Sequence, residues 1–161
     1  KDQTTKESIL AFARDSEAAS SALPSDADSG LKLVDAYIAL CTFYRTTPHP
    51  DVLSQLRFAW PCIAPSKKSG RAFSDHDLLP LCELLRQHPD ATAHICDLSF
   101  REASLKSTSA MALATTLSQR PIRSLDLTNQ KLGPKGGAIL AAALPRALML
   151  ESLVLKGCQL K

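Results

Sequence analysis

The stretch IRSLDLTNQKL at residues 122–132 decides the fold, because LESLVLKGCQL at residues 150–160 repeats its pattern. Each apolar residue of the first stretch matches an apolar residue of the second at a constant sequence offset of 28. Both stretches follow the pattern L-x-x-L-x-L, and both end on Leu after a polar residue or Cys. A unit this short cannot bury its apolar face alone, so two copies in register predict a stack of similar units.

An earlier copy of the pattern precedes these two. The apolar positions of residues 93–98 precede those of residues 122–127 at an offset of 29, whereas the apolar run at 111–117 precedes the run at 138–144 at an offset of 27. The mismatch predicts a longer loop in the first copy, at residues 101–104. Each copy is then one short strand followed by one helix.

The stretch LGPKGGAIL at residues 132–140 lies between the strand and the helix of the second copy. Together with the repeated leucines, it makes residues 93–161 similar to leucine-rich repeats of the ribonuclease-inhibitor-like subtype. The resemblance implies an α/β fold, a leucine-rich repeat solenoid with short parallel strands and outer helices. It also places Gln130 and Cys158 where such repeats bond the backbone of the neighbouring turn, which implies structural rather than reactive roles for both.

Helix signals come before the repeats. Apolar residues at helical spacing predict helices over residues 4–19, 31–45, 51–60 and 74–88. Ser74 and Asp77 have the spacing of a capping box, and Asp51 suits an N-cap. We expect a linker at residues 20–30 and a loop at residues 62–73.

The chain is therefore expected to divide near residue 90. Residues 1–90 form an all-α N-terminal cap, including a capping helix at 74–88, which is also a candidate for the helix of a degenerate first repeat. Residues 91–161 form two complete repeats and one truncated repeat. Because the third copy stops after its strand, we expect either further repeats or a cover for its apolar layer.

The strand residues between the leucines point away from the core, because side chains alternate along a strand. The offset of 29 predicts three rows across the strands: Ile95/Ser124/Ser152, Asp97/Asp126/Val154 and Ser99/Thr128/Lys156. Two facing carboxylates need either a cationic group of a partner or hydrogen bonds from neighbouring Ser or Thr. The predicted partner-binding residues are Asp97, Ser99, Arg123, Asp126, Thr128 and Lys156.

Composition narrows the class of function. The chain has 161 residues, 22% of them charged, and a net charge of +3, which divides into −2 for residues 1–90 and +5 for residues 91–161. The basic residues are scattered singly, without interleaved aromatic residues, which argues against nucleic-acid binding. No apolar run approaches the length of a membrane span. Five widely spaced cysteines in apolar surroundings favour free thiols and a cytoplasmic location.

No residue pattern indicates catalysis. Cys82, His88, His94 and Cys96 are ligand types for zinc, but their spacing matches no known zinc motif, so we expect no metal, no cofactor and no enzymatic activity. The sequence favours a non-enzymatic protein–protein interaction module or scaffold that binds protein through the strand surface. Two alternatives stay open: a GTPase-activating repeat protein, through the resemblance, and a structural adaptor of a cytoskeletal or ciliary assembly.

Overall fold

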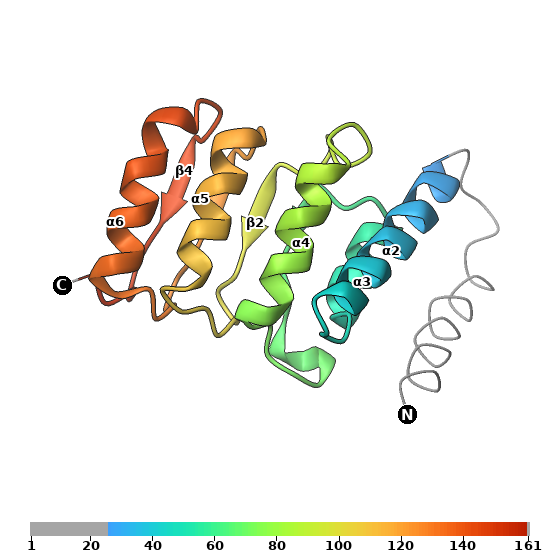
Figure 1. Cartoon of the computed structure of the whole chain (residues 1–161), viewed down its shortest axis with the longest axis horizontal. Helices are drawn as coiled ribbons and strands as arrows, with labels where there is room; N and C mark the ends of the chain where they lie inside the picture. The colour runs from blue at the N-terminus through green and yellow to red at the C-terminus, as the bar shows by residue number, and fades with distance from the viewer. Residues whose placement is uncertain (1–25, 161) are drawn as a thin grey trace.

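A computed structural model describes residues 26–160 of the chain (Figure 1). The elements in chain order are α2 (Asp26–Phe43), α3 (Pro50–Arg57), β1 (Cys62–Ile63), α4 (Asp75–Gln87), β2 (Asp97–Ser99), α5 (Ser109–Gln119), β3 (Ser124–Asp126), α6 (Gly133–Ala143) and β4 (Ser152–Val154). Two short 3-10 turns, η2 (Lys67–Ser69) and η3 (Leu144–Arg146), complete them. The helix predicted at residues 4–19 lies outside the described residues.

The four strands form one parallel sheet in the order β1-β2-β3-β4, with one helix between each strand and the next. The predicted α/β class, a mixed structure with short parallel strands, is therefore confirmed. Helices α4, α5 and α6 stand side by side in chain order along one side of the sheet, with α2 and α3 beyond α4 (Figure 1). Leucines from the strands fill the layer between helices and sheet, and Leu98 and Leu125 are buried in it.

The helix predicted at residues 31–45 begins earlier than expected. Asp26 starts α2, so the expected linker at residues 20–30 is wrong from residue 26 onward. Gly30 permits close packing of α2 on α3, because a Cβ built on it would lie 2.4 Å from the carbonyl oxygen of Arg57. His49, rather than the predicted Asp51, is the N-cap of α3, and Asp51 instead accepts a hydrogen bond from the Ser66 backbone N–H.

The loop predicted at residues 62–73 is wrong at its start. Cys62 pairs with Asp97 and Ile63 pairs with Leu98, which makes β1 the first strand of the sheet. Ile63 is fully buried. A strand this short cannot show the alternation by which strands are found in a sequence. The sheet therefore extends into the part of the chain that the sequence assigned to helices.

The capping box predicted at the start of α4 is confirmed. The backbone N–H and the hydroxyl of Ser74 both donate to Asp77 Oδ2 at 2.8 Å. Asp77 is fully buried and also accepts two hydrogen bonds from Arg71, at 2.6 and 2.7 Å. Burial alone would raise the pKa of Asp77, but the bonds from Arg71 and Ser74 outweigh it and hold that pKa below its usual range.

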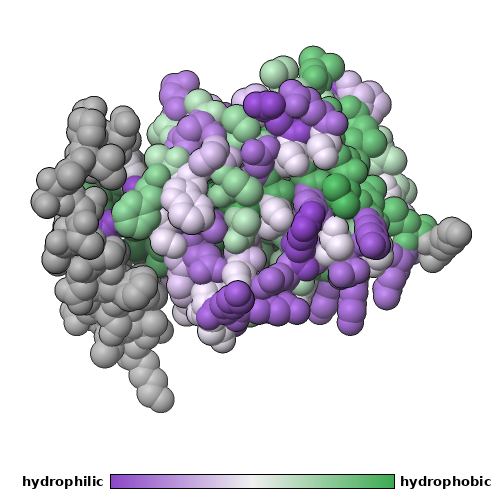
Figure 2. All heavy atoms as spheres, turned by 180° about the vertical axis from the view of Figure 1, so that it is seen from behind, coloured by the Kyte–Doolittle hydropathy of each residue, from purple (hydrophilic) through white to green (hydrophobic). Residues whose placement is uncertain are grey.

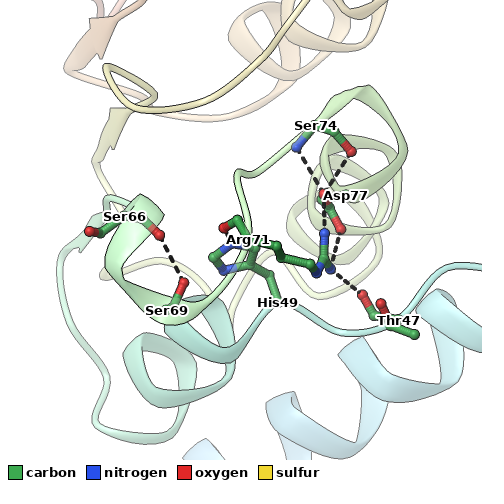
Figure 3. A network of polar contacts seen from close by, with 7 residues as sticks. All are labelled: Thr47, His49, Ser66, Ser69, Arg71, Ser74 and Asp77. Carbon is green, nitrogen blue, oxygen red and sulfur yellow. Dashed lines mark hydrogen bonds and ion pairs between the residues drawn. The ribbon is translucent and has the colours of Figure 1, made fainter.

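This carboxylate anchors a polar network that joins the α2–α3 connection to α4 (Figure 3). Arg71 donates to the Thr47 carbonyl oxygen at 2.6 Å, and its own carbonyl oxygen lies 3.2 Å from His49 Nε2. His49 is buried, and burial lowers its pKa. A neutral imidazole with its proton on Nε2 satisfies this contact, since that nitrogen then donates to the Arg71 carbonyl oxygen.

Hydrogen bonds also connect successive strand–helix units. The Gln130 Oε1 atom accepts the Leu105 backbone N–H at 2.9 Å, and the Cys158 thiol donates to the Leu127 carbonyl oxygen at 2.9 Å. Both side chains are buried. The predicted structural roles of Gln130 and Cys158, as bonds to the backbone of the neighbouring turn, are therefore confirmed.

Candidate binding surface on the sheet

The open side of the sheet carries the outward-facing strand residues, and their register differs from the prediction. Asp97 pairs with Ser124, and Ser99 pairs with Asp126, so the sequence numbers of the partners differ by 27. The predicted offset of 29 is wrong for this copy, because Leu98 pairs with Leu125 and Phe100 takes the place expected for Leu98. An offset of 27 also fits the helices, so no longer loop at residues 101–104 is needed.

The corrected register changes the rows. They are Asp97/Ser124/Ser152 and Ser99/Asp126/Val154. The carboxylates of Asp97 and Asp126 do not lie in one row, so the predicted facing pair is wrong. Ile95, expected at an outward position, is fully buried.

Asp126 is satisfied within the protein. Its Oδ1 atom accepts the backbone N–H of Thr128 at 2.9 Å and the Thr128 hydroxyl at 2.6 Å, and its Oδ2 atom forms an ion pair with Arg101 Nε. Burial opposes ionisation, but these bonds together keep the pKa of Asp126 below its usual range. The Asp126 carboxylate therefore holds the turn after β3, and with Thr128 it is a poor candidate for a partner contact.

Arg123 lies just before β3, at the edge where the strands begin. Its guanidinium donates to both carboxylate oxygens of Glu151 at 3.2 Å, and both side chains are more than half exposed. An exposed pair of this kind contributes little to stability. Arg123 therefore remains available to a partner at this edge.

Three of the predicted partner-binding residues are the least engaged by the rest of the protein: Asp97, Ser99 and Lys156. Asp97 and Ser99 are half-buried and Lys156 is exposed. Within residues 26–160, the Asp97 carboxylate accepts no hydrogen bond and the Lys156 ammonium donates none. Asp97 lies on β2 and Lys156 follows β4, so they occupy different ends of the open side.

Sequence reasoning left Arg101, Ser124 and Ser152 out of the candidate set. Ser124 pairs with Ser152 across β3 and β4, and Ser152 is exposed. Arg101 precedes Thr128 at the same offset as the β2–β3 pairs. Aligning Phe100 with Leu127 would have shown Arg101 as the first member of the Thr128/Lys156 row.

The described residues place no arrangement on this surface that points to catalysis or metal binding. Burial and the Asp97 charge raise the pKa of the neighbouring Cys62 thiol, and burial raises the pKa of Cys41 to about 12 and that of Cys82 to about 11. These thiols stay protonated at neutral pH. Across residues 26–160 no three His, Cys, Asp or Glu side chains come together as metal ligands would.

A shallow groove lies on the helix side, between α4 and α5. Its volume is about 270 Å³, and Leu79, Cys82 and Met111 are among the residues that line it. Glu83 and Arg86, which form an ion pair, also line it. The groove brings together no pair of groups suited to acid–base or nucleophilic chemistry.

Comparison with protein-family models found no match for this sequence, and comparison with curated proteins found none either. Among the described helices, none combines the length and the apolar character that crossing a bilayer requires.

Proposed function

We propose that this chain is a leucine-rich repeat protein of the ribonuclease-inhibitor-like subtype, and that it is a non-enzymatic module that binds another protein through the open side of its sheet. The single observation that carries the proposal is the register. Successive strands pair at sequence offsets of 27 and 28, through Leu98, Leu125 and Leu153. A helix follows each of the first two strands of this series, so the same unit recurs in the chain and in space.

The chemistry of the open side supports protein binding. Small hydroxyl side chains at Ser99, Ser124 and Ser152 leave room for a partner to approach the strands. Charged groups stand around them, with Asp97 on one strand and Arg123 at the edge. A polar surface with few side chains to rearrange suits recognition of a folded protein, since little conformational freedom is lost on binding.

Bulky substitutions on the two sides of the protein test this proposal. Ser124→Arg with Ser152→Arg fills the open side of the sheet, and Ala138→Arg with Ala141→Arg adds the same charge to exposed positions of α6. Partners recovered with the tagged wild-type chain from cell extract are expected to disappear with the sheet variant and to persist with the α6 variant. Equal recovery with both folded variants would remove the sheet surface from the proposal.

The GTPase-activating alternative is separated by a direct rate measurement. GTP hydrolysis by a panel of small GTPases is expected to be unchanged when the wild-type chain is added. Acceleration that the sheet variant abolishes would replace the binding module with an activator that uses the same surface.

A further inference from the structure

Positive charge is concentrated along one edge of the sheet, the edge at which the strands end and the connections to the helices begin. The exposed basic residues of this basic edge are Lys67, Lys68, Arg101, Lys106, Lys131, Lys135 and Lys156. By contrast, the connections that lead from α4, α5 and α6 back to the strands carry three arginines and two carboxylates. The two edges of the sheet therefore differ in charge.

The carboxylates at or beside the basic edge are engaged by other groups. Glu102 accepts the backbone N–H of Lys67 at 2.9 Å, and Asp75 accepts the backbone N–H of Lys106 at 2.8 Å. Asp77 and Asp126 each form an ion pair with an arginine. None of these carboxylates hydrogen-bonds to a lysine ammonium group within residues 26–160, although Glu102 attracts the charges of Lys67 and Lys68, and Asp75 attracts that of Lys106.

Hydrogen bonds between units place the basic residues next to one another. Lys106 and Lys131 are direct partners in an isolated parallel bridge. The Lys156 carbonyl oxygen accepts the Asn129 backbone N–H at 2.7 Å, which brings the third unit alongside the second. Figure 2 shows hydrophilic residues gathered along the lower rim, the edge on which these connections lie.

Three members of the edge lack a counter-charge. Within residues 26–160 the ammonium groups of Lys131, Lys135 and Lys156 make no hydrogen bond or ion pair, and all three side chains are exposed. Like charges side by side on neighbouring strands repel. The helix dipole of α6 adds to the positive potential at its N-terminus, and no acidic residue in its first turn offsets that charge.

We propose that the basic edge binds an acidic, extended polypeptide segment of a protein partner. This inference rests on the proposed function and adds the chemistry of the partner. Neighbouring strands lie about 4.8 Å apart, so the basic groups of three or four units extend over about 10–14 Å, the length of about four extended residues.

A polypeptide fits the edge better than the other polyanions do. Single-stranded nucleic acid is held by aromatic side chains that stack on bases. Among the described residues no exposed aromatic side chain belongs to the edge, since Phe73 and Phe100 are buried there and the exposed Phe43, Phe58 and Trp60 lie elsewhere. The hydroxyl of Ser107, in the connection that follows Lys106, can bond a peptide backbone.

The test uses a fluorescent peptide of eight glutamates and the full chain. Binding is followed by fluorescence anisotropy at about 150 mM salt, where distant charges are screened. Lys131→Glu with Lys135→Glu reverses two charges on the edge. The matched control, Arg45→Glu with Arg146→Glu, makes the same change in net charge at exposed positions away from it. Circular dichroism confirms that both variants fold.

The wild-type chain is expected to bind the peptide, the edge variant to bind about tenfold more weakly, and the control variant to bind within about twofold of wild type. If both variants bound the peptide equally weakly, the affinity would depend on net charge rather than on the edge, and the inference would be overturned. So would tighter binding of oligouridylate or of phosphatidylserine vesicles than of the peptide. The proposed function fails separately, if the Ser124→Arg, Ser152→Arg variant keeps its partners.

Discussion

Asp75, in the first turn of α4, holds the segment that leads into α5 of the following unit: its Oδ1 atom accepts the backbone N–H of Lys106 at 2.8 Å. The same carboxylate accepts the hydroxyls of Thr108 and Ser109. Asp75→Ala is expected to lower the free energy of unfolding by about 1–2 kcal/mol, because the Lys106 N–H and the two hydroxyls lose their acceptor. Urea unfolding measures it. Ser107→Ala, which removes a hydroxyl with no bond to residues 26–160, should change little, and an equal loss there would mean that the Asp75 hydrogen bonds do not join the two units.

The Arg71–Asp77 pair predicts a larger effect. Asp77→Ala leaves the Arg71 guanidinium and the Ser74 donors without their acceptor, and we expect a loss of about 3 kcal/mol in the free energy of unfolding. Glu83→Ala breaks the exposed pair with Arg86 instead and should cost under about 1 kcal/mol. Thermal or urea unfolding compares the two. Similar losses would mean that the buried network does not hold α4 to the preceding segment.

His49 predicts a pH dependence. Burial lowers its pKa in the folded protein, so the unfolded chain binds a proton at His49 before the folded chain does. The free energy of unfolding should therefore fall as pH drops below about 6.5, by up to about 1.4 kcal/mol per pH unit, until the folded pKa is reached. Asp77 and Asp126, whose pKa values are lowered, contribute only in a more acidic range, below about 4.

His49→Gln isolates this contribution, because the amide N–H can still donate to the Arg71 carbonyl oxygen. The variant should show a shallower loss of stability between about pH 7 and about pH 5.5 than wild type. Burial lowers the pKa of His94 as well, so some slope remains in the variant. An unchanged slope would mean that His49 is accessible to protons in the folded state.

Two helical glycines should respond in opposite ways to Ala. At Gly30 a Cβ would lie 2.4 Å from the Arg57 carbonyl oxygen, which is backbone, so α2 must move away from α3. We expect Gly30→Ala to destabilise by about 1–3 kcal/mol. At Gly137 the Cβ would meet only the end of the Leu160 side chain, which can turn aside, so Gly137→Ala should be neutral or gain up to about 1 kcal/mol. Destabilisation of equal size at both sites, measured by urea unfolding, would contradict the tight α2–α3 contact.

Local signals in the sequence predicted the elements that depend on local chemistry. The Ser74–Asp77 capping box indicated the start of α4, and the offset of 28 predicted the pairing of Leu125 with Leu153. Phe100 broke the aliphatic pattern of the first copy. Because the prediction aligned leucines alone, it placed Asp97 opposite Asp126, whereas Asp97 pairs with Ser124 in the structure.

The rest depended on contacts between residues far apart in the chain. Arg101 reaches Asp126 from the preceding unit, and nothing in the turn sequence marks Asp126 as already satisfied. Cys62 and Ile63 form a strand because β2 supplies a partner, rather than through any preference of their own. Predicting them required the sheet to be known first.

The claim that partners bind the open side of the sheet is tested most directly by site-specific photocrosslinking. A photoreactive amino acid placed at Ser99, on the sheet, or at Ala141, on the exposed side of α6, captures whatever protein contacts that position in cells. We predict crosslinked partners at Ser99 that are absent at Ala141 and are lost when Ser124→Arg is added. Partners captured at Ala141 and none at Ser99 would contradict the account.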